Sequence, residues 1–214
     1  YQASSSEMFG KSKPPQNEKT LFQPRSVYAI SKVFAYHSVI HYREAYDVHA
    51  CNGILFNHES PRRGVNFVTK KIVQGLVRIK QGKQKILTLG NLYSRRDWGH
   101  AKDYVESMWK ILQHKKPNDF VIATNTSHSV KNFINICAKK LNINLVWKNK
   151  GLKEVGINKL TKKTIIKVDK KYFRETEVDD LIGDFTKAKK LLKWKPKYSF
   201  NKLVDDMIYN ELNG

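Results

Sequence analysis

Apolar and polar positions form alternating stretches along this chain, and the stretches predict helices and strands in turn. Apolar residues recur with helical spacing from about Ser26 to Tyr46. The same spacing predicts further helices at about 67–80, 100–112, 129–141, 184–192 and 200–212. Short apolar runs predict strands at 1–6, 49–56, 85–89, 120–124, 145–147 and 164–168. Polar residues at 10–24, 58–66 and 150–163 predict irregular connections. This alternation indicates an α/β fold.

The first predicted strand ends at a run of serines, Ser4-Ser5-Ser6. Catalytic groups of open α/β sheets lie outside the carboxyl ends of their strands. A dinucleotide-binding half would also show G-x-G-x-x-G after its first strand. That motif is absent from the sequence, and the chain opens on Tyr1 rather than methionine. We therefore expect the C-terminal portion of a longer protein, lacking on the order of a hundred residues, one half of a doubly wound sheet.

The net charge of +21 raises the question of a nucleic-acid partner. Lysines account for most of the 40 basic residues and are spread along the chain. Most of the arginines instead cluster, at Arg62-Arg63, Arg95-Arg96 and Arg174. Forked guanidinium donors suit phosphate groups, so this pattern favours a nucleotide ligand over a polynucleotide. A basic binding module without catalysis is the alternative from another class, and salt-dependent retention on DNA or RNA would favour it.

Other features of the composition point to a cytoplasmic protein without a membrane partner. No apolar run is long enough to span a bilayer, and no secretory signal is present. The two cysteines, Cys51 and Cys137, lie in apolar contexts. They are expected to be buried free thiols in a reducing compartment.

Two segments near the start carry candidate chemistry. Ser5 and Glu7 place a hydroxyl and a carboxylate two positions apart. Tyr28 and Lys32 are four residues apart, so on a helix they share one face. A lysine ammonium beside a tyrosine favours the phenolate, because opposite charges attract. Such a phenol can take and return the proton of a substrate hydroxyl.

These segments, with QASSSEMFG at 2–10 and NHESPRRG at 57–64, resemble the GDP-mannose 4,6-dehydratase family of extended short-chain dehydrogenase/reductases. The resemblance runs from Tyr1 to about Glu211. It implies the second half of a doubly wound, Rossmann-like parallel sheet with a smaller α/β substrate-binding domain. It also implies conversion of GDP-mannose to GDP-4-keto-6-deoxymannose by internal hydride transfer through bound NADP.

The resemblance implies a role for each candidate in the first two segments. Tyr28 takes the proton of the C4 hydroxyl, and Lys32 holds the nicotinamide ribose. Ser5, where the family usually has threonine, orients the C4 oxygen. Glu7 removes the C5 proton. Superfamily epimerases and reductases need no base at C5, so Glu7 separates the dehydratase from its nearest rival.

Further residues match ligand-binding positions of the family. His58 and Arg63 match cofactor contacts. His58 could equally be a capping residue or a core histidine with satisfied hydrogen bonds. The implied substrate contacts are Asn57, Lys70, Asn91, Arg96, Arg174 and Glu177. Lys70 or Lys71 could equally lie on a solvent-exposed helix face, and Arg96-Asp97 could be a structural ion pair. Glu175 stands where the family has a proline next to the position matching Arg174. His37, His41 and Glu44 have metal-like helical spacing, but the family's reaction needs no metal.

The resemblance also suggests domain boundaries and an assembly. Residues 1–57 and 96–116 would complete the NADP-binding domain, and residues 58–95 and 117–214 would form the nucleotide-sugar domain. The family forms homodimers and homotetramers. Two alternatives stay open, namely another nucleotide-sugar epimerase or reductase of the superfamily, and a fragment that is catalytically inert.

Overall fold

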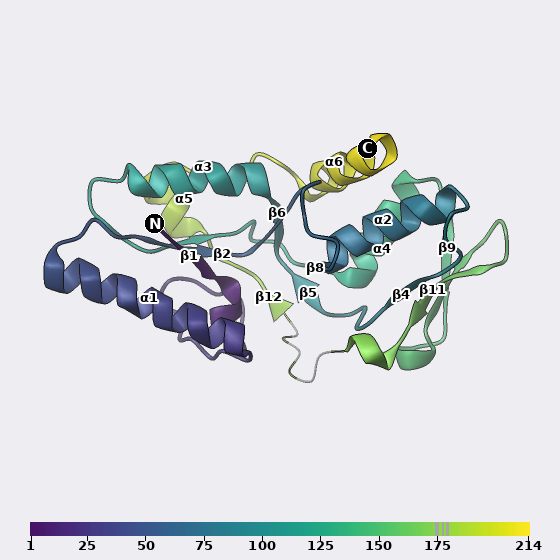
Figure 1. Cartoon of the computed structure of the whole chain (residues 1–214), viewed down its shortest axis with the longest axis horizontal. Helices are drawn as coiled ribbons and strands as arrows, with labels where there is room; N and C mark the ends of the chain where they lie inside the picture. Colours follow the sequence, from purple (N-terminus) through teal and green to yellow (C-terminus); the bar gives the residue numbers. More distant parts are fainter. Residues whose placement is uncertain (174–175, 177, 179) are drawn as a thin grey trace. The chain divides into compact units, whose positions relative to one another are not determined.

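The computed structural model describes every residue except 174, 175, 177 and 179 (Figure 1). The chain forms two compact units. Unit 1 comprises residues 1–58, 95–127 and 178–199, and unit 2 comprises residues 59–94, 128–177 and 200–214. Strands and helices alternate in both, which confirms the predicted α/β class.

A parallel sheet forms the centre of unit 1. Its strands are β1 (Gln2–Ser5), β2 (Asn52–Leu55) and β7 (Phe120–Ile122), in the order β1-β2-β7. Ser5 pairs with Leu55, and Leu55 pairs with Ile122, so the three carboxyl ends lie at one edge. Residues of β2 and β7 are buried throughout, as expected for a parallel sheet covered on both faces.

Helices cover both faces of this sheet. In Figure 1, α1 (Val27–Tyr46) lies on one side of β1 and β2, and α3 (Ala101–Leu112) with α5 (Thr186–Leu192) lies on the other. Ser26 caps α1 by accepting the backbone N–H of Ala29, which explains why the helix begins where the sequence predicts. The shorter elements of unit 1 are η1 (Ser6–Met8), β5 (Arg95–Arg96), β6 (Trp98–His100) and β12 (Asp180–Leu181).

A buried polar network joins α1 to the amino ends of β2 and β7. Both Asp119 oxygens accept from the Arg43 guanidinium, at 3.0 and 2.9 Å. The Asn52 side chain donates to Asp119 at 2.9 Å, and the Tyr36 hydroxyl donates at 3.2 Å. Burial opposes ionisation, but the bonds from Arg43 and Asn52 outweigh it and lower the pKa of Asp119.

Replacing Asp119 by alanine is therefore expected to destabilise the protein by about 3–5 kcal/mol, because Arg43 would be left partly buried without its counter-ion. Urea denaturation measures the change. Asp169→Ala is the control, since this exposed carboxylate caps only a short turn. Equal losses in the two variants would contradict the special role of the network.

A second buried carboxylate, that of Asp97, ties three segments of unit 1 together. One oxygen accepts the backbone N–H and the hydroxyl of Thr124, at 2.9 and 2.6 Å. The other accepts the backbone N–H of Gly183 at 3.2 Å. Burial raises the pKa of Asp97 to about 6 despite these bonds.

This raised pKa predicts a pH dependence of stability. The folded protein holds the Asp97 proton more tightly than the unfolded chain does, so the contribution of Asp97 to the unfolding free energy falls as the pH rises from about 4 to about 6. The fall is on the order of 2–3 kcal/mol. Urea denaturation from pH 4 to pH 7 should show this decline in the wild type relative to Asp97→Asn. Parallel profiles would contradict it.

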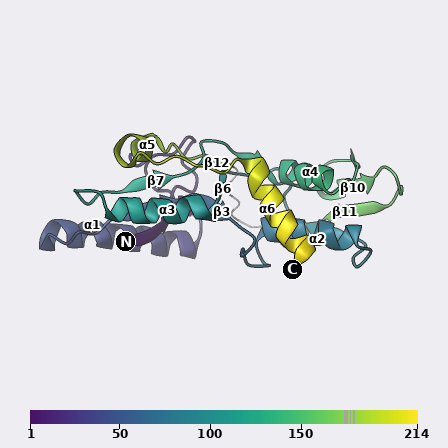
Figure 2. The ribbon, with the colours of Figure 1, turned by 90° about the horizontal axis from the view of Figure 1, so that it is seen from above.

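Unit 2 is built around a mixed sheet. Its strand order is β4 (Leu87–Leu89), β11 (Thr164–Val168), β10 (Val155–Asn158) and β9 (Leu145–Lys148), with only β4 and β11 parallel. Its helices are α2 (Val68–Lys80), α4 (Val130–Lys140) and α6 (Phe200–Asn213), and Figure 2 shows α6 crossing α2. The remaining elements are β3 (Asn57–Glu59), which begins in unit 1, β8 (His128–Ser129), η2 (Gly151–Lys153) and η3 (Lys170–Tyr172).

The structure differs from the sequence prediction in two respects. Residues 150–163 are not irregular throughout, because β10 pairs with β9 on one side and β11 on the other. Residues 117–127 and 178–199, placed by sequence with the second domain, cluster with unit 1. The reason is that β7 pairs with β2 and that α5 packs on β7.

Cys51 and Cys137 are both free and buried, which confirms this part of the cysteine prediction. None of the helices in the described residues is both long and apolar enough to cross a membrane.

Candidate active site

Ser5 and Glu7 lie where β1 ends. Ser5 is the last residue of the strand and also the N-cap of η1, with its hydroxyl oxygen accepting the backbone N–H of Glu7 at 3.2 Å. Ser5 is buried and Glu7 is half-buried. The hydroxyl and the carboxylate thus lie at the edge where parallel α/β sheets place their functional groups.

Tyr28 and Lys32 lie in the first turns of α1, which packs against β1 and η1. The Lys32 ammonium donates to the backbone carbonyl of Ala3 at 2.8 Å. It also lies 5.7 Å from the centroid of the Tyr28 ring. Tyr28 is 55% exposed, so its side chain is accessible to a ligand. The Lys32 ammonium therefore reaches the strand that ends in Ser5.

Asn57 and His58 follow the end of β2. The His58 ring stacks on Tyr104 at 5.0 Å between centroids, and its Nδ1 lies 2.9 Å from the carbonyl oxygen of Phe56. The Asn57 side-chain oxygen is buried and has no hydrogen-bond partner among the described residues. Buried acceptors are rarely left unpaired in native proteins, so a donor from a ligand would suit this atom.

Two of the remaining candidates belong to unit 2 near the start of α2. Arg63 pairs with Glu59 at 3.1 Å, and its guanidinium carbon lies 3.4 Å from the centroid of the Phe67 ring. Lys70 lies 2.7 Å from a carboxylate oxygen of Glu211 in α6. Lys70 thus has a structural partner, and its ligand contact stays a prediction.

The other candidates are Asn91 and Arg96, which follow β4, and Arg174 and Glu177. The side-chain oxygen of Asn91 accepts the backbone N–H of Tyr93 at 2.9 Å, which forms a local turn. Arg96 is buried and donates to the carbonyl of Val178 at 2.7 Å. Arg174 and Glu177 lie outside the described residues, so their roles stay predictions.

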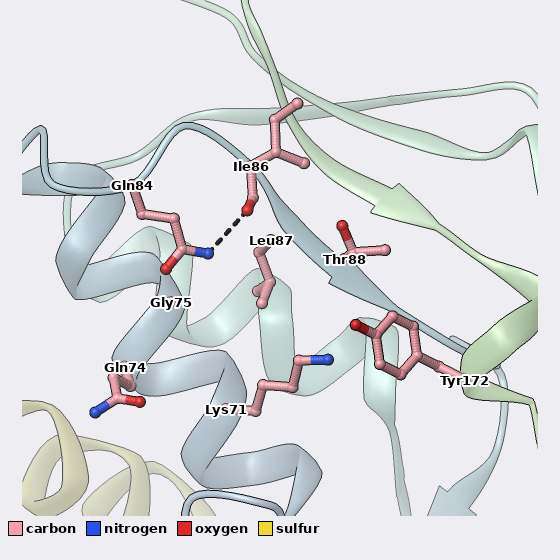
Figure 3. A pocket seen from close by; sticks show the side chains of 8 residues that line it. All are labelled: Lys71, Gln74, Gly75, Gln84, Ile86, Leu87, Thr88 and Tyr172. Carbon is pink, nitrogen blue, oxygen red and sulfur yellow. Dashed lines mark hydrogen bonds between the residues drawn. The ribbon is translucent and has the colours of Figure 1, made fainter.

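A pocket of about 250 Å³ opens in unit 2 between α2 and β4 (Figure 3). The Lys71 ammonium lies in it, 3.7 Å from the centroid of the Tyr172 ring. Burial, helped by the Lys171 ammonium, lowers the pKa of Lys71. Its lining residues are Lys71, Gln74, Gly75, Gln84, Ile86, Leu87, Thr88 and Tyr172.

The metal-like spacing on α1 has a different explanation. His37 packs edge-on against Tyr36, and His41 against Tyr42. In the part of the chain that the structure describes, no three His, Cys, Asp or Glu side chains converge as metal ligands would.

Comparison with known proteins decides the family. The model of the GDP-mannose 4,6 dehydratase family matches residues 1–207. This chain belongs to the GDP-mannose 4,6-dehydratase family. The family's protein from Dictyostelium discoideum is 53% identical over 99% of this chain and 60% of its own length. The human one is 52% identical over 99% of this chain and 57% of its own length. The chain thus spans less than two thirds of these relatives.

Solved structures confirm the fold. The structure of RMD from Pseudomonas aeruginosa complexed with NADPH has a TM-score of 0.83 at 18% identity, covering 99% of this chain and 65% of its own. The dTDP-glucose 4,6-dehydratase from Bacillus anthracis in complex with NAD has a TM-score of 0.79 at 19% identity, covering 100% and 61%. At these identities the likeness establishes the Rossmann-type fold alone, which family members share.

The sequence analysis did not identify the residues that line the pocket around Lys71 in this family member. Gln74, Gln84 and Tyr172 line the pocket with Lys71, yet they are polar or aromatic residues without a motif. Gly90 could have been identified from the sequence as a position that requires glycine. A side chain there would come within 2.2 Å of the Tyr172 carbonyl oxygen. A glycine directly after a strand indicates such a close approach of two backbones.

Proposed function

We propose that this chain carries the acid–base centre and the nucleotide-sugar-binding residues of a GDP-mannose 4,6-dehydratase. Membership of the family supports the activity. The observation that carries the proposal is the placement of the Lys32 ammonium, within 2.8 Å of β1 and beside Tyr28, on the strand that ends in Ser5 and leads to Glu7.

We further propose NADP as the cofactor, with Tyr28, Lys32, His58 and Arg63 as its contacts. A bound nicotinamide supplies reversible hydride transfer. The residues present fit such a group, because Tyr28 is exposed, Lys32 is half-buried, and both can bond ribose hydroxyls. A guanidinium such as that of Arg63 is suited to bidentate bonds with a phosphate. The structural neighbour from P. aeruginosa, a complex with NADPH, favours NADP.

The four catalytic candidates divide the proton transfers among them. Ser5 donates a hydrogen bond to the C4 oxygen, and Tyr28 accepts the proton of the C4 hydroxyl. The acceptor form of Tyr28 is the phenolate, which the positive charge of Lys32 stabilises before the proton is taken up. With C4 oxidised to a ketone, the C5 proton becomes acidic. Glu7 removes it and passes a proton to the departing C6 hydroxyl, which leaves as water. Saturating the resulting C5–C6 double bond takes a proton at C5 and a hydride at C6, and the bound nicotinamide would supply that hydride.

The substrate contacts follow from the family positions. Asn57, with its buried unpaired oxygen, is proposed to accept from the sugar nucleotide. The other proposed contacts with GDP-mannose are Lys70, Asn91, Arg96, Arg174 and Glu177. The product, GDP-4-keto-6-deoxymannose, would be the first intermediate toward GDP-deoxyhexoses such as GDP-fucose. A homodimer or homotetramer in the cytoplasm is the proposed form.

The proposal is tested with the full-length protein and GDP-mannose in heavy water. A dehydratase should form the 4-keto product and place solvent deuterium in the sugar. The reason is that the proton lost from C5 exchanges with solvent. A solvent hydrogen is then returned to C5. Mass spectrometry and proton NMR measure both. An unlabelled sugar without 4-keto product would rule the function out.

A further inference from the structure

Unit 2 contains a buried carboxylate to which the mechanism above gives no role. Glu59 is 1% exposed. One of its oxygens accepts the hydroxyl of Thr69 at 2.5 Å and lies 3.1 Å from Nε of Arg63. An isolated buried charge is costly, so this carboxylate depends on its two partners. Thr69 lies in the first turn of α2, which ties the carboxylate to a rigid element.

The guanidinium of Arg63 is restrained on two sides. Its Nε edge faces Glu59, in an ion pair without hydrogen-bond alignment. One of its faces lies on the Phe67 ring, 3.4 Å from the centroid. Within the described residues, neither terminal nitrogen has a hydrogen-bond partner. Arg63 can therefore bond a ligand through the edge that carries both terminal nitrogens.

The adjacent arginine shows that this arrangement is specific. Arg62 is exposed, and among the described residues its hydrogen bonding is limited to its backbone N–H, which donates to the Ser60 hydroxyl. Of two neighbouring arginines, only Arg63 is held by a buried acid and an aromatic ring. Restraining a long side chain before binding removes part of the entropy that binding would otherwise cost.

We propose that Glu59, fixed by Thr69, is a positioning residue that presents the two terminal nitrogens of Arg63 to a phosphate group of the dinucleotide cofactor. The inference rests on the proposed function, which makes Arg63 a cofactor contact. Forked donors and a phosphate match in geometry, so the orientation of the guanidinium decides whether both bonds form.

The test is a double-mutant cycle on NADPH affinity, measured by fluorescence titration of the full-length protein. The variants are Glu59→Gln, Arg63→Lys and both together. Glutamine keeps the volume and can still accept from Thr69, and lysine leaves a cation beside Glu59. We expect Glu59→Gln to weaken NADPH binding about tenfold, comparable to the loss of a group that orients a metal ligand. In the Arg63→Lys background the same change should have little effect.

Two matched variants separate positioning from general damage. Glu154→Gln removes another glutamate of unit 2 that is 1% exposed and paired, with Lys131 at 2.5 Å. Arg62→Lys changes the adjacent arginine. Both should keep wild-type NADPH affinity. Melting temperatures, measured in parallel, report how much each change costs the fold.

The outcomes are distinct. A loss from Glu59→Gln that persists undiminished in the Arg63→Lys background, or an equal loss from Glu154→Gln, overturns the positioning role. Should the wild type bind NADPH and convert GDP-mannose while the cycle shows no coupling, only this inference fails. A wild type without nicotinamide affinity overturns both the inference and the proposed function.

Discussion

Replacing Glu7 by glutamine is expected to lower the rate of GDP-mannose dehydration by about 10²–10⁴-fold, the usual contribution of a positioned general base. Glutamine has nearly the same shape as glutamate but cannot accept the C5 proton. GDP-mannose affinity should change little, because the nucleotide contacts are proposed at other residues. Formation of the 4-keto product and calorimetric titration with GDP-mannose measure the two effects.

The matched control is Glu44→Gln, which removes an exposed carboxylate of α1 in the same unit. It should leave the rate unchanged. The Glu7 variant also separates the dehydratase from a superfamily epimerase, which needs no base at C5 and would retain its activity. Full dehydration by Glu7→Gln would show that another group removes the C5 proton.

Replacing Tyr28 by phenylalanine should reduce turnover by a similar factor, about 10²–10⁴-fold, since the C4 hydroxyl would lose its proton acceptor. Oxidation at C4 precedes elimination, so both the 4-keto product and solvent deuterium in the sugar should be lost together. In Glu7→Gln, by contrast, oxidation at C4 is retained and elimination fails. Rapid-quench analysis of bound sugar distinguishes the two variants.

Tyr42 provides a close control for this substitution. It lies on the same helix and is 56% exposed, against 55% for Tyr28. Tyr42→Phe removes a hydroxyl of similar exposure from the same helix without affecting the proposed chemistry. Equal losses in Tyr28→Phe and Tyr42→Phe would place the effect in α1 itself rather than in proton transfer.

Local patterns predicted most of the elements that position the catalytic candidates. The apolar period and the cap Ser26 located α1 within one residue of its observed start at Val27. Prediction succeeds there because helix period and capping depend on residues a few positions apart. The strand β10 was missed because its apolar pattern is short, and its existence depends on pairing with β9 and β11.

The ion pairs between segments far apart in the chain could not be predicted. The sequence offers 40 basic residues and only 19 acidic ones, so nothing local selects the partners of these pairs. In the folded chain Lys70 meets Glu211 of the last helix, and Arg43 meets Asp119 of a strand end. These contacts join residues far apart in the chain, and they decide which charges are held and which are available to a ligand.

The amino-acid sequence by itself determined the family resemblance, the α/β class and the acid–base candidates, because these depend on residue type and short spacing. Only the tertiary structure decided that the Lys32 ammonium reaches β1, that Lys71 lines a pocket and that Thr69 of α2 fixes Glu59 beside Arg63. The physical reason is that burial and partner choice arise from packing between distant segments, and these two properties determine the charge state and orientation of a side chain.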